Sequence, residues 1–161
     1  MVLKILLITI FILLYVIYKL YFNKYHKVKR IFETLSNFLN VRDALVLKII
    51  SEINDKKVSE KIFNLINGRK ENFKTSYNNS IRADAKLNKE LRNFYEILNN
   101  IKKNEVVNSV FAKIINLEKD LKNIRNEYNK VVEEYNQNLI KHKFICLRVI
   151  KMKPLDTYKK S

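Results

Sequence analysis

The first 22 residues of the chain are almost entirely apolar, whereas the rest of the chain alternates apolar and polar positions. Between residues 5 and 18 no side chain is charged, and Thr9 is the only polar residue other than tyrosine. A helix needs about 20 residues to cross a bilayer, and residues 2–22 supply that length. The pattern therefore predicts a transmembrane signal-anchor over residues 1–23.

A cleavable signal peptide is the alternative interpretation of this segment. Such a peptide needs small residues at a cleavage site after the apolar run. Here the run is followed by YKLYFNKYHK, which contains neither alanine nor glycine. The sequence therefore favours an anchor that is not removed.

Basic residues on either side of the predicted span indicate its orientation. One lysine, Lys4, precedes it, and five basic residues follow from its exit end onward: Lys19, Lys24, Lys27, Lys29 and Arg30. Positive charge is retained on the cytoplasmic side. We therefore expect a cell-membrane protein with a short external N-terminus, a cytoplasmic C-terminal part, and basic residues that lie against anionic headgroups at about 1 kcal/mol each.

After the anchor, apolar residues recur every three or four positions, which is the spacing of one helix face. No glycine or proline interrupts the chain at first, so one helix is expected to continue from the membrane to about Ile53. Asn54-Asp55 is the first predicted turn. A second helix should begin near Lys57 and a third should cover roughly 81–102; whether these two join stays open at this point.

The last helical stretch has a repeat of seven residues. Its two apolar positions, a and d, are occupied by Val107, Ile114, Leu121, Tyr128 and Tyr135, and by Val110, Leu117, Ile124 and Val131. This 3.5-residue period is typical of helices that pack at shallow angles. The expected fold is all-α: the transmembrane helix continues into an up-and-down antiparallel bundle of three to four long helices over 24–143. A basic, mostly irregular tail is expected over 144–161.

Two Tyr-Asn pairs lie seven residues apart in this helix. Tyr128 and Tyr135 occupy the apolar seam, and Asn129 and Asn136 follow on its flank. The simpler interpretation is that the rings pack in the core while each hydroxyl finds a partner at the edge of the bundle. Contact with a ligand is the alternative.

The same stretch resembles the C-terminal helix of the LemA family. The residues that carry the resemblance are Glu118, Leu121, Arg125, Tyr128-Asn129, Val132 and Tyr135-Asn136, and Arg42 with Leu35 and Leu39 resembles the first-helix segment of that family. The family's Arg-x-Asp-Leu-Ile-Pro element is altered here, and its Tyr-Pro and Phe-Pro elements are missing. The resemblance is thus to a divergent member. It implies a helical bundle on a membrane anchor, and it brings no established enzymatic activity.

Composition adds little chemistry to this picture. One glycine and one proline in 161 residues disfavour an all-β fold. There is no glycine-rich phosphate loop, and His26, His142 and Cys146 do not have the spacing of metal ligands. We expect no catalytic residues, no cofactor and no metal site.

The net charge of +16 leaves more than one function class open. The leading hypothesis is a non-enzymatic interaction or scaffolding module that binds the lipid bilayer, together with an unknown protein partner or a second copy. The alternative is a membrane-tethered protein that binds nucleic acid without specificity, although acidic residues interspersed in the last helix count against it. A rod-like stalk is a third hypothesis, which the several predicted turns disfavour.

Overall fold

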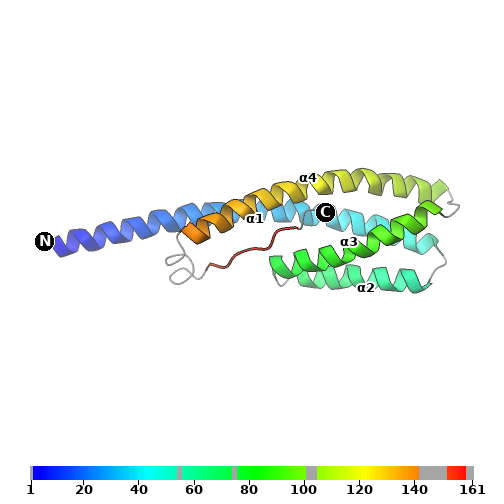
Figure 1. Cartoon of the computed structure of the whole chain (residues 1–161), viewed down its shortest axis with the longest axis horizontal. Coiled ribbons are helices and arrows are strands. Elements are labelled where there is room, and N and C mark those ends of the chain that lie inside the picture. Colours follow the sequence, from blue (N-terminus) through cyan, green and yellow to red (C-terminus); the bar gives the residue numbers. More distant parts are fainter. Residues whose placement is uncertain (1, 54–55, 74–75, 101–104, 142–151, 159–161) are drawn as a thin grey trace.

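The computed structural model describes residues 2–53, 56–73, 76–100, 105–141 and 152–158. It contains four helices: α1 (Val2–Glu52), α2 (Lys56–Phe73), α3 (Tyr77–Asn100) and α4 (Glu105–Lys141). The helices run alternately up and down, and the described ranges contain no strand (Figure 1). The predicted all-α bundle is therefore confirmed. The open question about the middle of the chain is answered as well, because α2 and α3 are two antiparallel helices that pack side by side.

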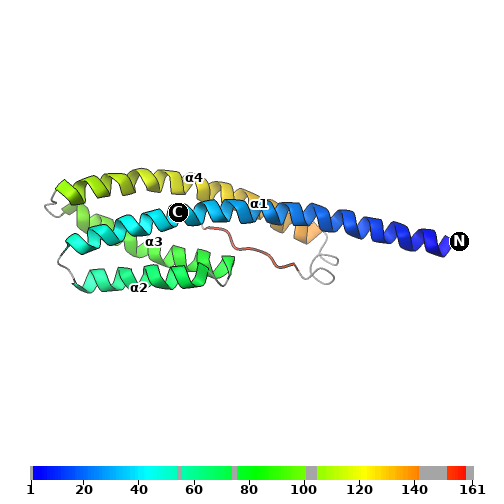
Figure 2. The same ribbon diagram turned by 180° about the vertical axis from the view of Figure 1, so that it is seen from behind.

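Helix α1 serves both as the candidate anchor and as a wall of the bundle. Its 51 residues contain neither glycine nor proline, the usual causes of a sharp kink. The N-terminal part extends beyond the other three helices (Figure 2). Most of its large apolar side chains from Val2 to Leu20 are exposed, whereas Leu14 and Ile17 are half-buried. Within the described residues, α1 is the one helix that is long and apolar enough to cross a membrane.

The bundle has two apolar clusters, one nearer the N-terminal extension and one farther from it. We call them the proximal core and the distal core. The proximal core joins α1 and α4 and contains, among others, Phe32, Leu35, Leu39, Leu121, Tyr128, Val132 and Tyr135. The distal core takes residues from all four helices, including Val46, Ile49, Ile62, Ile66, Leu87, Leu91 and Ile114. The predicted burial of both seam tyrosines is confirmed.

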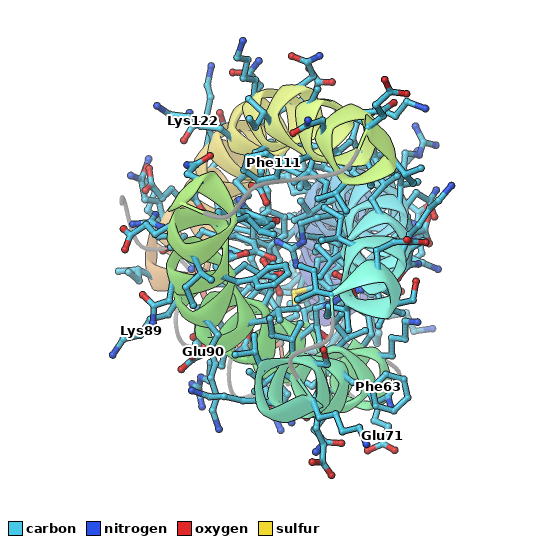
Figure 3. The ribbon with its side chains drawn as sticks, turned by 90° about the vertical axis from the view of Figure 1, so that its right-hand side faces the viewer. Phe63, Glu71, Lys89, Glu90, Phe111 and Lys122 are labelled. Carbon is cyan, nitrogen blue, oxygen red and sulfur yellow. The ribbon has the colours of Figure 1, made fainter. Side chains whose placement is uncertain are left out.

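Seen along its long axis, the bundle has its helices arranged around a centre that side chains occupy (Figure 3). The charged side chains labelled there, Glu71, Lys89, Glu90 and Lys122, lie on the outside. Phe111 belongs to the distal core and is buried, whereas Phe63 is exposed. The amphipathic period of each helix thus positions its apolar stripe inward, as the sequence predicted.

The C-terminal segment 152–158 is neither helix nor strand, and it returns along the bundle from the end of α4 toward the middle (Figure 1). It joins the proximal core through Met152, Leu155 and Tyr158. Several sequence predictions lie outside the described residues: the Asn54-Asp55 turn, the end of the third helix at Lys102, and the chain from His142 through residue 151.

Gly68 offers a simple test of local helix energetics. It lies inside α2, and a methyl group added at its Cα would meet no atom within 4 Å. Glycine in a helix interior costs about 1 kcal/mol relative to alanine. We therefore expect Gly68→Ala to increase the free energy of unfolding by about 1 kcal/mol, measured by thermal denaturation of the detergent-solubilised chain. A decrease would show that the bundle needs the flexibility of glycine at this position.

Candidate functional site

Charged and amide side chains from all four helices meet between the two apolar cores. We call this cluster the polar core. Its members are Asn40, Arg42 and Asp43 from α1, Arg69 from α2, Asp84 and Asn88 from α3, and Glu118 and Arg125 from α4. On α1 the cluster interrupts the apolar stripe between Leu39 and Val46. The sequence of α1 therefore already contains the polar interruption that separates the proximal core from the distal core.

Arg42 lies at the centre of the polar core and is fully buried. Its Nη2 atom lies 2.8 Å from Asp84 Oδ1, and its Nη1 atom donates to Asn88 Oδ1. Nη1 is also 3.8 Å from Glu118 Oε1. One guanidinium thus joins α1 to both α3 and α4, using the several fixed donors that arginine provides.

A second arginine ties α2 to α1. Both Nε and Nη2 of Arg69 donate to Asp43 Oδ2, at 3.0 and 2.5 Å. Nη2 also donates to Asn40 Oδ1 at 3.0 Å. Arg69 and Asp43 are both buried. Because burial makes an unpaired charge costly, each of these residues requires the other.

Arg125 completes the network from α4. Its Nη2 atom lies 3.2 Å from Asp84 Oδ2 and 3.2 Å from Asn88 Oδ1. Its Nη1 atom donates to Glu118 Oε2 at 3.5 Å. The guanidinium also lies 5.5 Å from the centre of the Tyr158 ring. Arg125 therefore links the polar core to the C-terminal segment.

The electrostatics of the polar core favour the charged forms of Asp84 and Arg42. Burial by itself would raise the pKa of Asp84, but the charges of Arg42 and Arg125 and the hydrogen bond from Arg42 outweigh it and lower that pKa. Burial likewise opposes the charge of Arg42, and Asp84, Asp43 and Glu118 more than compensate, so its pKa is raised. These carboxylates already accept hydrogen bonds from arginine. The arrangement is suited to fixing the register of four helices.

The sequence analysis found only part of this network. It named Arg42, Glu118 and Arg125, but only among the residues that carry the family resemblance. It did not place Asn40, Asp43, Arg69, Asp84 or Asn88 in a shared site. The available signal was a carboxylate on an apolar stripe, because Asp84 lies one helical turn after Ile81 and one turn before Leu87.

The Tyr-Asn pairs of α4, together with Asn78 and Arg82 of α3, bind residues 152–158. We call the surface that these side chains form the tail groove. The Tyr128 hydroxyl donates to the carbonyl of Asp156 at 3.3 Å, and the Tyr135 hydroxyl donates to the carbonyl of Lys153 at 3.2 Å. Burial raises the pKa of Tyr128, so its hydroxyl stays protonated as a donor at neutral pH. The expected partners at the bundle edge are thus main-chain carbonyls of the chain's own C-terminal segment.

The two asparagines pair with the same segment in a repeated geometry. Asn136 donates to the carbonyl of Leu155 at 2.7 Å and accepts from its N–H at 3.0 Å. Asn129 makes the same pair of bonds with Tyr158, at 2.9 and 2.7 Å. From α3, Asn78 accepts the N–H of Asp156 at 2.9 Å, and Arg82 pairs with the Asp156 carboxylate at 2.9 Å.

The basic residues predicted to face headgroups lie along α1 at the base of its N-terminal extension. Lys19, Lys27, Lys29 and Arg30 are exposed, and Lys24 is half-buried. Lys29 Nζ lies 3.8 Å from Glu33. A shallow, open depression of about 460 Å³ is lined by Asn23, His26, Lys27 and Arg30. The described part of the chain holds no cluster of His, Cys, Asp and Glu arranged to bind a metal ion.

The residues that carried the family resemblance therefore fall into three structural roles. Arg42, Glu118 and Arg125 belong to the polar core, and Leu121 and Val132 are buried in the proximal core. The two Tyr-Asn pairs line the tail groove. In comparisons with known proteins, no family model matches the chain, and no curated protein or solved structure shows significant similarity to it.

Proposed function

We propose that this chain is a membrane-anchored, non-enzymatic helical-bundle protein of the LemA type, which acts as a protein-interaction or scaffolding module at the cytoplasmic face of the membrane. The observation that carries the proposal is the continuity of α1. Its exposed apolar part leads without a break into the face that packs the bundle. Such a helix would hold the bundle rigidly at the surface of a bilayer, within reach of other membrane proteins.

The cytoplasmic orientation rests on the distribution of charge around the candidate span. Lys4 lies before the uncharged run of residues 5–18, and Lys24, Lys27, Lys29 and Arg30 follow that run closely. Epitope tags at both ends should therefore differ in their access to protease added to intact cells. The N-terminal tag is expected to be cleaved and the C-terminal tag protected; a C-terminal tag that is cleaved would reverse the proposed orientation.

The interaction function is tested by crosslinking the full chain in intact membranes and identifying the captured proteins. We expect the same neighbours in repeated experiments, or a crosslinked pair of copies. The matched control carries lysine at Ile10 and Leu13 of α1, which should remove the chain from the membrane and remove those neighbours from the captured set. Recovery of monomer alone from the wild-type chain would overturn the proposal.

A further inference from the structure

We propose that the tail groove is a binding site for an extended peptide segment of a partner protein that carries the pattern Leu-Asp-x-Tyr. In this proposal residues 152–158 are the chain's own ligand for the site. The proposal deepens the interaction function given above and rests on it, because it names the chemistry of the partner. The argument starts from how the groove contacts the main chain of its occupant.

The groove recognises main-chain groups at two matched positions. Each asparagine amide pairs with both the N–H and the C=O of one residue, Asn136 with Leu155 and Asn129 with Tyr158. A neighbouring β-strand offers a peptide the same pair of groups, and peptide-binding domains use such main-chain bonds for affinity. These contacts would therefore be available to any extended segment that reaches the groove.

The spacing of the two asparagines matches an extended occupant. Seven residues span nearly two turns of a helix, so Asn129 and Asn136 lie on one side of α4, separated by about 10.5 Å. Leu155 and Tyr158 are three residues apart, which is about 10 Å in an extended chain. A helical occupant would cover only about 4.5 Å over the same three residues and could not pair with both amides.

Side-chain contacts add selectivity to this main-chain recognition. The Tyr158 ring is buried, meets the Tyr128 ring edge-on at 5.8 Å, and lies 5.5 Å from the Arg125 guanidinium. Leu155 packs against the proximal core, and Asp156 pairs with Arg82. Lys153 and Pro154 are exposed. The groove thus selects Leu, Asp and Tyr at positions one, two and four and leaves the side chains of the two preceding residues open.

The occupant can be exchanged without dismantling the helices. All of its hydrogen bonds described above are made with side chains of α3 and α4, so no backbone bond within a helix depends on it. Departure of the segment would expose tyrosine, asparagine and arginine tips, which water can satisfy, and the part of the proximal core under Met152, Leu155 and Tyr158, which the apolar side chains of a partner segment would cover again. The polar core would still hold Arg125 through Asp84 and Glu118.

The test uses the full chain in phospholipid nanodiscs and a fluorescent peptide. The probe is residues 152–158 with blocked ends, which has no net charge because Lys153 and Asp156 cancel. The host carries Leu155→Ser and Tyr158→Ser, which weakens its own segment. We expect the peptide to bind this host at least tenfold more tightly than the wild-type chain, measured by fluorescence anisotropy.

Two controls distinguish binding in the tail groove from non-specific binding of the peptide. A peptide with the same Leu155→Ser and Tyr158→Ser changes keeps the charge and should not bind. A host that also carries Asn129→Ala and Asn136→Ala should lose at least tenfold in affinity. Equal binding in either control, or no binding to a host that retains its helical circular dichroism and thermal transition, would overturn the proposal. If the double host is unfolded, the single variant Leu155→Ser takes its place under the same criteria.

A second copy of the chain is the competing occupant. Light scattering would then show a wild-type dimer that the Leu155→Ser, Tyr158→Ser host does not form, and that result would overturn the assignment to a partner protein. The failures of the two proposals are distinguishable. Captured neighbours without peptide binding would refute only the groove. Peptide binding without captured neighbours would refute the interaction function and, with it, the assignment of the groove to a partner protein.

Discussion

Replacing Asp84 with leucine is expected to lower the free energy of unfolding of the bundle by about 3–5 kcal/mol. Asp84 accepts from Arg42 on one carboxylate oxygen and from Arg125 on the other. Its removal leaves two guanidiniums short of a partner, one of them fully buried, where an uncompensated charge is most costly. Chemical denaturation of the full chain in detergent, followed by circular dichroism, measures the effect.

The control for this change is Glu96→Leu, which removes an exposed carboxylate from the same helix. Surface substitutions of this kind are usually within about 0.5 kcal/mol of neutral. Asp84→Asn should fall between the two, because the amide keeps an acceptor but loses the negative charge. If Asp84→Leu costs no more than Glu96→Leu, the polar core does not stabilise the bundle in the way we describe.

The same residue makes stability depend on pH. The folded chain lowers the pKa of Asp84 below its usual range, whereas in the unfolded chain a carboxyl of this type has a pKa of about 3.9. A lowered pKa contributes stability that is fully present above the unfolded value and is lost as the pH falls through the folded value. The wild-type chain should therefore lose stability below about pH 4, with a steeper slope than the Asp84→Asn variant. Equal slopes would contradict the assignment.

Two lysines in the apolar part of α1 are expected to abolish membrane insertion. Ile10 and Leu13 are 45% and 58% exposed, so their replacement leaves the bundle intact. A lysine near the centre of a spanning helix costs about 2.5–3.5 kcal/mol for insertion, and the double variant should therefore lose about 5–7 kcal/mol. The wild-type chain should stay in the membrane pellet after alkaline extraction, and the variant should not.

The matched control places the same two lysines on the bundle. Val41 and Ile115 are 52% and 48% exposed, so Val41→Lys with Ile115→Lys adds the same charge without touching the candidate span. This variant should remain in the pellet. Extraction of the wild-type chain by alkali, or retention of the Ile10→Lys, Leu13→Lys variant as an integral protein, would contradict the assignment of α1 as an anchor.

Periodicity was sufficient to predict the helices but not their shared centre. Apolar residues at three- and four-residue steps identify a helix face regardless of what the face meets, and the continuous α1 followed from the lack of glycine and proline before Ile53. Asp84 depends instead on cations from α1 and α4, which are distant in sequence. A single carboxylate on an apolar stripe indicates that partners exist, and only the packed bundle identifies Arg42 and Arg125 as those partners.

The tail groove could not be predicted from the sequence either, because the residues that form it and the segment that it binds are distant in sequence. The seven-residue repeat of Tyr128-Asn129 and Tyr135-Asn136 was visible, and it correctly predicted that the rings are buried. The segment 152–158 has no helical or alternating pattern of apolar residues. Its conformation is fixed instead by hydrogen bonds to side chains of α3 and α4, which the sequence of the segment does not indicate. Composition therefore suggested an irregular tail. Its packing becomes clear only when two lengths are compared: the separation of Asn129 and Asn136 along α4, and the separation of Leu155 and Tyr158 in an extended chain.

The unbroken course of α1 has a mechanical consequence. Beyond the candidate span the helix continues for roughly 30 residues, or about 45 Å, and the polar core fastens the other three helices to it. Set in a bilayer, such a helix would behave as a lever. Spanning helices tilt in response to bilayer thickness, and a change of about 10° would swing the far end of the bundle sideways by about 8 Å, given that length. The thickness of the membrane would thereby change the position of the distal end of the bundle relative to the membrane surface.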